Sequence, residues 1–343
     1  MPNLLLTTRC VRSCPYCFAR REIEASSSAD SVSWEDLIFL ADFLEASGDR
    51  HISLLGGEPT LHRDFVDFVL YLHERGFSIT VFTSGVLSNA CLCDLERYLR
   101  AVPPGPLSFV CNLNDPEQIS APPGETERVH EFLSVMGPWV SPGFNIHRPD
   151  FRLEFIIELV ARYGLMRQLR LGIAHPVPGN PGTHVSPGMV RQAIDRLCSY
   201  RALFERFRIK PGLDCGFPLC QFSDEQLGWF HRLTGEALRF YCCPAIDIAP
   251  DMSVYSCFPL SRFHRRSIYE FDSMREVLDF YHHKNDAIRA ELAGIFEECD
   301  GCIHREEGVC AGGGACHLLC RLTDEAPVRL PEIQRGLSDT RLP

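Results

Sequence analysis

The sequence predicts an α/β protein in which residues 1–205 form a parallel sheet flanked by helices, followed by a smaller cysteine-rich region. Short apolar runs of strand length alternate with amphipathic runs of helix length. Strands separated by helices pair in parallel through right-handed crossovers. Of the 343 residues, 45% are hydrophobic, which is enough to bury a sizeable core, and 17 are cysteines.

Six apolar runs are expected to be strands, beginning with the stretch around Leu4-Leu5-Leu6. Each run is short and is followed by a segment with helical periodicity, as in repeated βα units. The expected strands are 3–8, 51–55, 77–83, 107–113, 140–146 and 168–174.

The segments after these strands are expected to be helices. Ser33 is a suitable N-cap for the first helix, and Gly76 and Gly164 are suitable C-caps for the second and fifth. The expected helices are about 34–47, 62–75, 88–100, 125–136, 153–163 and 187–205. The second has an apolar face of Phe65, Phe68, Val69 and Leu72, and the fifth has a stripe of Leu153, Ile156, Ile157, Val160 and Ala161.

Three cysteines, Cys10, Cys14 and Cys17, follow the first strand on one short loop. Three thiolates so close together can bind three irons of a cubane cluster and leave the fourth iron open to a small molecule. A zinc knuckle or plain buried thiols are the alternatives. The spacing C-x3-C-x2-C does not match the paired C-x2-C halves of zinc sites.

This loop, with the aromatic Tyr16 before the last cysteine, resembles the signature of the radical S-adenosylmethionine (radical SAM) enzymes. The resemblance implies a [4Fe-4S] cluster whose open iron chelates SAM and cleaves it reductively to a 5′-deoxyadenosyl radical. It also implies that residues 1–205 form a partial (β/α)6 TIM-like barrel. Functional groups are then expected at the carboxyl ends of the strands.

Two further loops resemble SAM-binding elements of that family. The first, Gly56-Gly57-Glu58-Pro59, is similar to the GGEP motif that binds the amino group of SAM, and the second, Thr83-Ser84-Gly85, is similar to a TNG-type turn. Three polar residues at the ends of later strands are expected near SAM, with satisfied polar groups at strand ends as the alternative. They are Asn112, Asn145 and Arg170.

Residues 242–322 resemble the SPASM domain, which holds two auxiliary iron–sulfur clusters in many radical SAM maturases. The resemblance implies one auxiliary [4Fe-4S] cluster on Cys299, Cys302, Cys310 and Cys320. It implies a second on Cys243, Cys257 and Cys316, with Cys242 or an upstream cysteine as fourth ligand. Met252 stands where the family has Gly, so the turn there is expected to differ. A single-cluster twitch version and a zinc ribbon are the alternatives.

Residues 206–241 are expected to bridge the two domains, and 323–343 to form a tail. Cys215 and Cys220 in the bridge are expected either to complete an auxiliary cluster or to donate a hydrogen atom to a substrate radical. Asp214 beside them is expected to be a base or a turn residue. The remaining cysteines are expected to be buried small hydrophobes. They are Cys91, Cys93, Cys111 and Cys198.

The net charge and the cysteine content limit the classes of partner and the cellular compartment that we expect. The net charge of −11 argues against a nucleic-acid partner. Abundant cysteines without a secretion signal or a membrane-length apolar run indicate the reducing cytoplasm. The first strand begins at residue 3, so we expect no leader-peptide recognition domain before it and, for a peptide substrate, a separate leader-binding protein. A flavodoxin- or ferredoxin-type protein is expected as electron donor.

The sequence therefore predicts a radical SAM enzyme that abstracts hydrogen from a substrate carbon. The expected substrate is a peptide or protein, and the expected modification is a crosslink, an oxidation or an epimerisation. A small-molecule substrate such as a sugar or amino acid is the first alternative. A non-catalytic iron–sulfur electron-transfer protein is the second, although it would need neither the GGEP-like loop nor six βα units.

Overall fold

The structure is a computed structural model. It describes residues 2–20, 30–101, 106–175, 184–214, 216–236, 238–240, 242, 245–261, 263–292, 294–316 and 318.

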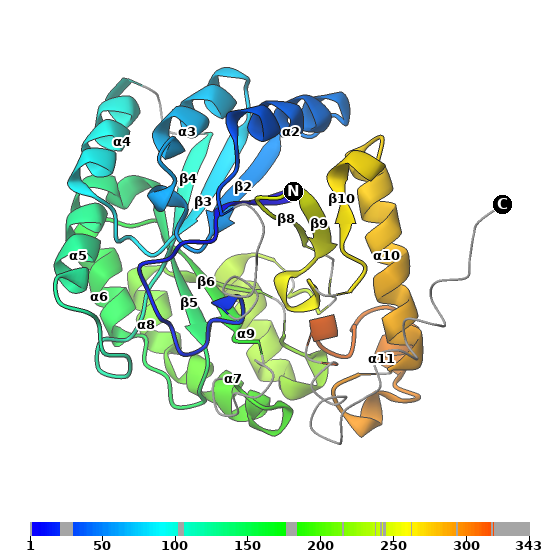
Figure 1. The fold of residues 1–343 in the computed structure, drawn as a ribbon. Helices are drawn as coiled ribbons and strands as arrows, with labels where there is room; N and C mark the ends of the chain where they lie inside the picture. The colour runs from blue at the N-terminus through cyan, green and yellow to red at the C-terminus, as the bar shows by residue number, and fades with distance from the viewer. Residues whose placement is uncertain are drawn as a thin grey trace.

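Within these residues the strands form one open sheet in the order β10-β9-β8-β1-β2-β3-β4-β5-β6-β7. Figure 1 shows helices packed along the outside of the curved sheet. Every pair of neighbouring strands from β8 through β1 to β7 is parallel. Strand β9 pairs antiparallel with both β8 and β10. The predicted α/β fold and partial barrel are confirmed. The strands are β1 (Pro2–Thr7), β2 (His51–Gly56), β3 (Ser78–Thr83), β4 (Leu107–Asn112), β5 (Val140–Ile146), β6 (Gln168–Ile173), β7 (Lys210–Leu213), β8 (Ile246–Ile248), β9 (Ser253–Ser256) and β10 (Arg266–Ser267).

Two of the predicted caps are present at helix ends. Ser33 caps its helix by accepting from the backbone N–H of Asp36, and Gly164 ends another in the left-handed conformation. Their apolar faces cover the sheet and enclose the main core. The helices are α2 (Trp34–Ala46), α3 (Phe65–Glu74), α4 (Asn89–Ala101), α5 (Glu125–Met136), α6 (Glu154–Tyr163), α7 (Val190–Ser199), α8 (Arg201–Phe207), α9 (Asp224–Thr234), α10 (Met274–Glu291) and α11 (Ile303–Glu306).

Three predicted helices differ in detail. The helix expected at 62–75 starts at Phe65, because a 3-10 turn over Pro59–Leu61 precedes it and His62 bonds the carbonyl of Val32 at 2.9 Å. The helix expected at 187–205 is α7 and α8, separated at Tyr200, whose hydroxyl donates to Glu154 at 2.8 Å. Ala161, expected on the apolar stripe of α6, is exposed.

The segment expected as a bridge, 206–241, contributes β7 and α9. Strand β7 extends the parallel sheet past its sixth strand, and β8 pairs with β1 on the other side. One sheet therefore includes strands from residues 1–205 and from residues 242–322, which were expected to form separate domains. The domain boundaries stay a prediction.

The hairpin expected at the start of the C-terminal region is β8–β9. Met252 in its turn has φ +60°, the left-handed conformation that suits the Gly expected there from the family. Helix α10 fills the predicted helical gap that follows. Among the described helices, none combines the length and the apolar character needed to cross a membrane.

Candidate functional site

The cysteine loop leaves the carboxyl end of β1 and turns tightly, with the N–H of Cys17 donating to the carbonyl of Cys14 at 3.1 Å. The backbone N–H of Arg12 points at Sγ of Cys10 at 3.4 Å, and Nδ2 of Asn114 at Sγ of Cys14 at 3.5 Å. Cys10 is exposed, whereas Cys14 and Cys17 are half-buried. The three predicted cysteines thus lie on one tight loop at the carboxyl end of β1.

Burial raises the pKa of the Cys10 and Cys17 thiols, and neighbouring thiols add to the shift at both. Metal binding must therefore displace their protons. In the part of the chain that is described, no three His, Cys, Asp or Glu side chains converge on one ion position. A cubane does not require such convergence, because each thiolate binds a different iron. The soft three-thiol donor set of the loop fits such a cluster.

The glycine-rich loop after β2 is fastened to the start of the cysteine loop. The N–H of Gly57 donates to Thr7 at 2.8 Å, and the N–H of Glu58 donates to Arg9 at 2.7 Å. A Cβ on Gly57 would lie 2.1 Å from the carbonyl oxygen of Arg9. The close approach expected of these glycines is therefore made to the protein's own chain.

Glu58 connects this loop to the turn after β3. Its side chain is only 1% exposed. Oε1 accepts from the Thr83 hydroxyl at 2.7 Å, and Oε2 accepts from the backbone N–H of Ser84 at 2.7 Å and its hydroxyl at 2.5 Å. Thr60 donates to Oε1 as well. Three residues predicted for the same ligand meet here, with the carboxylate occupied by internal donors.

The other predicted polar residues lie on the next strands, Asn112 and Asn145 near the carboxyl ends of β4 and β5 and Arg170 in the middle of β6. Asn112 ends β4, and its carboxamide oxygen is buried without a partner among the described residues. Asn145 on β5 pairs in register with Gly172 on β6. Arg170 forms an ion pair with Asp214, just after β7, and stacks over the ring of Phe82. The carboxylate of Asp214 is therefore paired with a side chain of the neighbouring strand β6.

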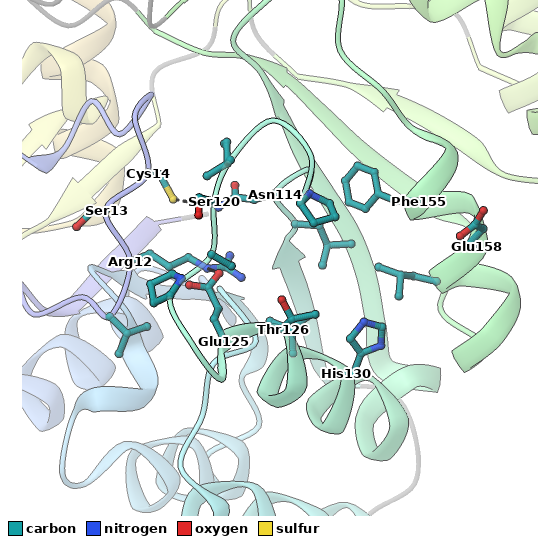
Figure 2. A pocket seen from close by; sticks show the side chains of 18 of the residues that line it. Arg12, Ser13, Cys14, Asn114, Ser120, Glu125, Thr126, His130, Phe155 and Glu158 are labelled. Atoms are coloured by element: carbon teal, nitrogen blue, oxygen red, sulfur yellow. Dashed lines mark hydrogen bonds and ion pairs between the residues drawn. The ribbon is translucent and has the colours of Figure 1, made fainter.

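A cavity of about 370 Å³ lies on the outer side of the cysteine loop (Figure 2). The loop after β4 and helices α5 and α6 form its other walls. Cys14 lines it together with Arg12 and Asn114, and Phe155 and His130 lie toward the far end. The cavity thus reaches the cysteine loop from outside the sheet.

The C-terminal cysteines fall into two groups. Burial raises the pKa of Cys299, and the nearby thiols of Cys220, Cys310 and Cys302 raise it further. The Cys310 segment pairs with Phe240, whose ring lies 5.4 Å from that of Phe222. The expected group of Cys299, Cys302 and Cys310 is therefore accompanied by Cys220.

Of the second expected group, Cys242 and Cys257 flank the β8–β9 hairpin. Burial raises the pKa of Cys257 to about 12, with Asp247 and Cys242 contributing. Sγ of Cys316 lies 3.0 Å from Nδ1 of His175, at the end of β6. Burial lowers the pKa of His175 to about 4, so this ring is neutral.

Three predicted site cysteines, Cys215, Cys243 and Cys320, lie outside the described residues. Of the cysteines expected to be buried, Cys111 is buried, Cys91 and Cys198 are half-buried, and Cys93 is exposed on α4, which corrects that expectation.

Sequence reasoning missed the side chains that surround the predicted residues. Arg12, Asn114 and His175 all contact predicted cysteines or their loop. The position of Arg12 between two cysteines was a visible signal. Neither Asn114 nor His175 has a local pattern that could have indicated it.

Residues 4–117 match the family model described as the radical SAM superfamily. This match supports radical SAM membership. It covers the strand, the cysteine loop and both SAM-type loops described above.

Two curated relatives are similar to this chain. An S-adenosylmethionine-dependent nucleotide dehydratase of Selenomonas ruminantium is 37% identical over 86 residues, which is 25% of this chain and 30% of the relative. A PqqA peptide cyclase of Methylobacterium sp. (strain 4-46) is 27% identical over 216 residues, 56% of this chain and 54% of the relative. The chain thus spans about half or less of these relatives. Both are enzymes, which supports the prediction of an enzyme.

Two solved structures share the fold. The chain anSMEcpe with bound AdoMet has a TM-score of 0.64 at 14% identity, covering 98% of this chain and 95% of that chain. Streptococcus suis SuiB bound to S-adenosylmethionine has a TM-score of 0.62 at 14% identity, covering 91% and 72%. At this identity they establish the fold alone.

Proposed function

We propose that this protein is a radical SAM enzyme. One electron cleaves a carbon–sulfur bond of SAM to give methionine and the 5′-deoxyadenosyl radical, which takes a hydrogen atom from a substrate carbon to give 5′-deoxyadenosine. When bound, a four-iron cluster on Cys10, Cys14 and Cys17 supplies that electron. The observation that carries the proposal is the pair of backbone hydrogen bonds that join the start of this three-thiol loop to Gly57 and Glu58 at the carboxyl ends of β1 and β2.

The protein's own groups bind SAM and orient it. We propose that the SAM site is lined by the loop 56–59, by the turn at Thr83 and Ser84, and by Asn112, Asn145 and Arg170 on the later strands. The carboxylate of Glu58 and the N–H groups of Gly57 and Glu58 already form hydrogen bonds within the protein, so we propose that this loop contributes backbone carbonyl groups. A closed, dry site then protects the radical from water.

We propose a peptide or protein as substrate. The match to a PqqA peptide cyclase covers more of this chain than the match to the nucleotide dehydratase. SuiB, which shares the fold with a TM-score of 0.55, is solved with its precursor peptide SuiA. The dehydratase match favours the second candidate, a small-molecule substrate. We also propose a cytoplasmic location, a flavodoxin- or ferredoxin-type donor and a separate leader-binding protein.

We further propose that the two C-terminal thiol groups hold one or two auxiliary clusters of SPASM or twitch type. The neighbourhood of Cys220 and Cys299 supports a ligand role for Cys220. Its alternative role, hydrogen donor in an epimerisation, is separated by turnover in heavy water, since a thiol exchanges its proton with solvent. Deuterium at a product carbon would support the donor. A product two hydrogens lighter and free of deuterium would exclude it.

The test of the main proposal is anaerobic reconstitution with iron, sulfide, SAM and dithionite. Wild type should form 5′-deoxyadenosine, and the variant Cys10→Ala/Cys14→Ala/Cys17→Ala should not, while keeping its C-terminal iron. Cys93→Ala, an exposed thiol on α4, is the matched control. Retained 5′-deoxyadenosine in the triple variant would refute the assignment. Product from a free sugar or amino acid but from no candidate peptide would establish the second candidate.

A further inference from the structure

Arg12 lies between two of the loop cysteines, yet its side chain points into the protein. It is 7% exposed and its Nε lies 2.7 Å from Oε1 of Glu125, which is 9% exposed. One guanidinium nitrogen also donates to the carbonyl of Asn112 at 2.7 Å. Figure 2 shows the pair at the wall of the cavity, beside Cys14.

This arrangement joins three elements that are distant in the sequence. Glu125 is the first residue of α5, 113 positions after Arg12, and Asn112 ends β4. A carboxylate in the first turn of a helix is itself favoured by the helix dipole. The guanidinium therefore fastens the middle of the cysteine loop to a strand end and a helix start.

A buried ion pair of this kind is a poor source of net stability. Removing water from both charges costs about as much as their attraction returns, whereas removing one partner alone leaves an uncompensated buried charge and is strongly destabilising. Arg97 and Asp94, with 82% and 50% exposed side chains, form an ordinary surface pair, which contributes little to stability. The buried pair is thus better explained by what it positions than by stability.

The guanidinium also sets the charge around one thiol. A guanidinium stays cationic throughout the pH range in which proteins are folded, and this one lies beside Cys14 at the wall of the cavity (Figure 2). The backbone N–H of the same residue points at Sγ of Cys10. One residue therefore presents a buried positive charge to Cys14 and a backbone donor to Cys10.

We propose that Arg12 is a positioning residue, held by Glu125, that fixes the cysteine loop for SAM cleavage and stabilises the added negative charge when a cluster on this loop is reduced. This inference rests on the proposed radical SAM function. It assigns to Arg12 two separable properties: geometry, which needs the planar guanidinium, and charge, which lysine also supplies.

Geometry is tested in the metal-free protein by a double-mutant cycle of Arg12→Gln and Glu125→Gln, followed by denaturant unfolding. Each single variant should be destabilised, and the double variant should lose clearly less than the sum. Arg97→Gln is the surface control. A double variant whose loss equals the sum of the two single losses would overturn the coupling, whether or not the protein proves to be a radical SAM enzyme.

Charge is tested in the iron-loaded protein, on the cluster whose paramagnetic resonance signal changes when SAM is added. Arg12→Gln should lower the reduction potential of that cluster and slow 5′-deoxyadenosine formation at least tenfold at equal iron content. Arg12→Lys should restore the potential but only part of the rate. An unchanged potential in Arg12→Gln would overturn the charge role. Absence of 5′-deoxyadenosine from wild type would instead refute the proposed function.

Discussion

At the scale of single residues, both carboxylate oxygens of Glu58 accept hydrogen bonds within the protein, although the resemblance to the GGEP motif predicts that this residue binds SAM. Five donors from Thr60, Thr83 and Ser84 surround its oxygens. Because the residue is fully enclosed, these bonds replace water that the carboxylate would otherwise bind. Its role is then to hold two loops in a fixed relation.

We predict that Glu58→Ala lowers the free energy of unfolding of the metal-free protein by about 3 kcal/mol, because several buried donors lose their acceptor. Glu58→Gln should lose less, since its amide keeps one acceptor oxygen. Denaturant unfolding measures both. Glu131→Ala, at an exposed site on α5, is the control and should change little. Equal stability of Glu58→Ala and the control would contradict this account.

The cysteine loop and the two SAM-type loops could be predicted because each is a contiguous run whose residue types and spacing are visible. The contacts that hold them could not. Arg12 meets Glu125 across 113 positions, and Cys316 meets His175 across 141. Such pairs depend on how distant elements pack, and a single sequence carries no local sign of them.

At the scale of elements, the β8–β9 hairpin keeps a left-handed turn without the expected Gly. Met252 adopts φ +60° and is 2% exposed, within the main core. The backbone conformation costs about 1–2 kcal/mol in a non-glycine residue. Burial of a Met side chain contributes about 2–5 kcal/mol, so packing outweighs the strain.

We therefore predict that Met252→Gly destabilises the protein by about 1–3 kcal/mol, the balance of these two contributions. The matched control is Arg208→Gly, at an exposed residue with φ +54° after α8, where relief of strain should stabilise by up to about 1 kcal/mol. Thermal unfolding compares the two variants. The same sign for both would show that burial does not decide the outcome at Met252.

The same hairpin predicts a pH dependence of stability. Burial raises the pKa of Asp247 on β8 to about 7, although hydrogen bonds from Asn3 and the N–H of Phe258 act the other way. In the unfolded chain this carboxyl titrates near pH 4, so the unfolded chain loses its proton first as the pH rises. The stability contributed by the protonated group is therefore full below about pH 4 and is lost as the pH rises through 7, on the order of 4 kcal/mol in total.

Asp247→Asn should remove this part of the dependence while keeping an acceptor for Asn3. Urea unfolding of the metal-free protein at pH 4.5 and 7.5 is the measurement. Wild type should lose more stability than the variant over this interval. Parallel changes in the two proteins would mean that Asp247 does not titrate there.

The elements themselves were largely predictable, and the exceptions have physical causes. Strand β7 contains Pro211 and Gly212, which disfavour strands, but it lies at the edge of the sheet, where proline is tolerated. The break between α7 and α8 occurs at Tyr200, whose hydroxyl is bound from another helix. Tertiary contacts decided both cases against the local pattern.

At the scale of the whole molecule, the number of thiol groups predicts the iron content. Three four-iron clusters would give about twelve irons per chain, and a twitch version about eight. Cys299→Ala/Cys302→Ala should lower the iron content of reconstituted protein by about four and leave the cysteine loop loaded. Metal analysis by mass spectrometry measures this. Stoichiometric zinc with little iron would refute the auxiliary-cluster proposal.

The place of β1 in the sheet has a consequence for synthesis on the ribosome. Strand β1 lies between β2 and β8, and Asn3 donates to Asp247 at 2.7 Å across 244 positions. At about 5–20 residues per second, β8 emerges roughly 10–50 seconds after β1. During that interval one edge of β1 is unpaired and open to incorrect partners. Iron delivered earlier would meet thiols on a loop whose supporting strand has only one of its two neighbours.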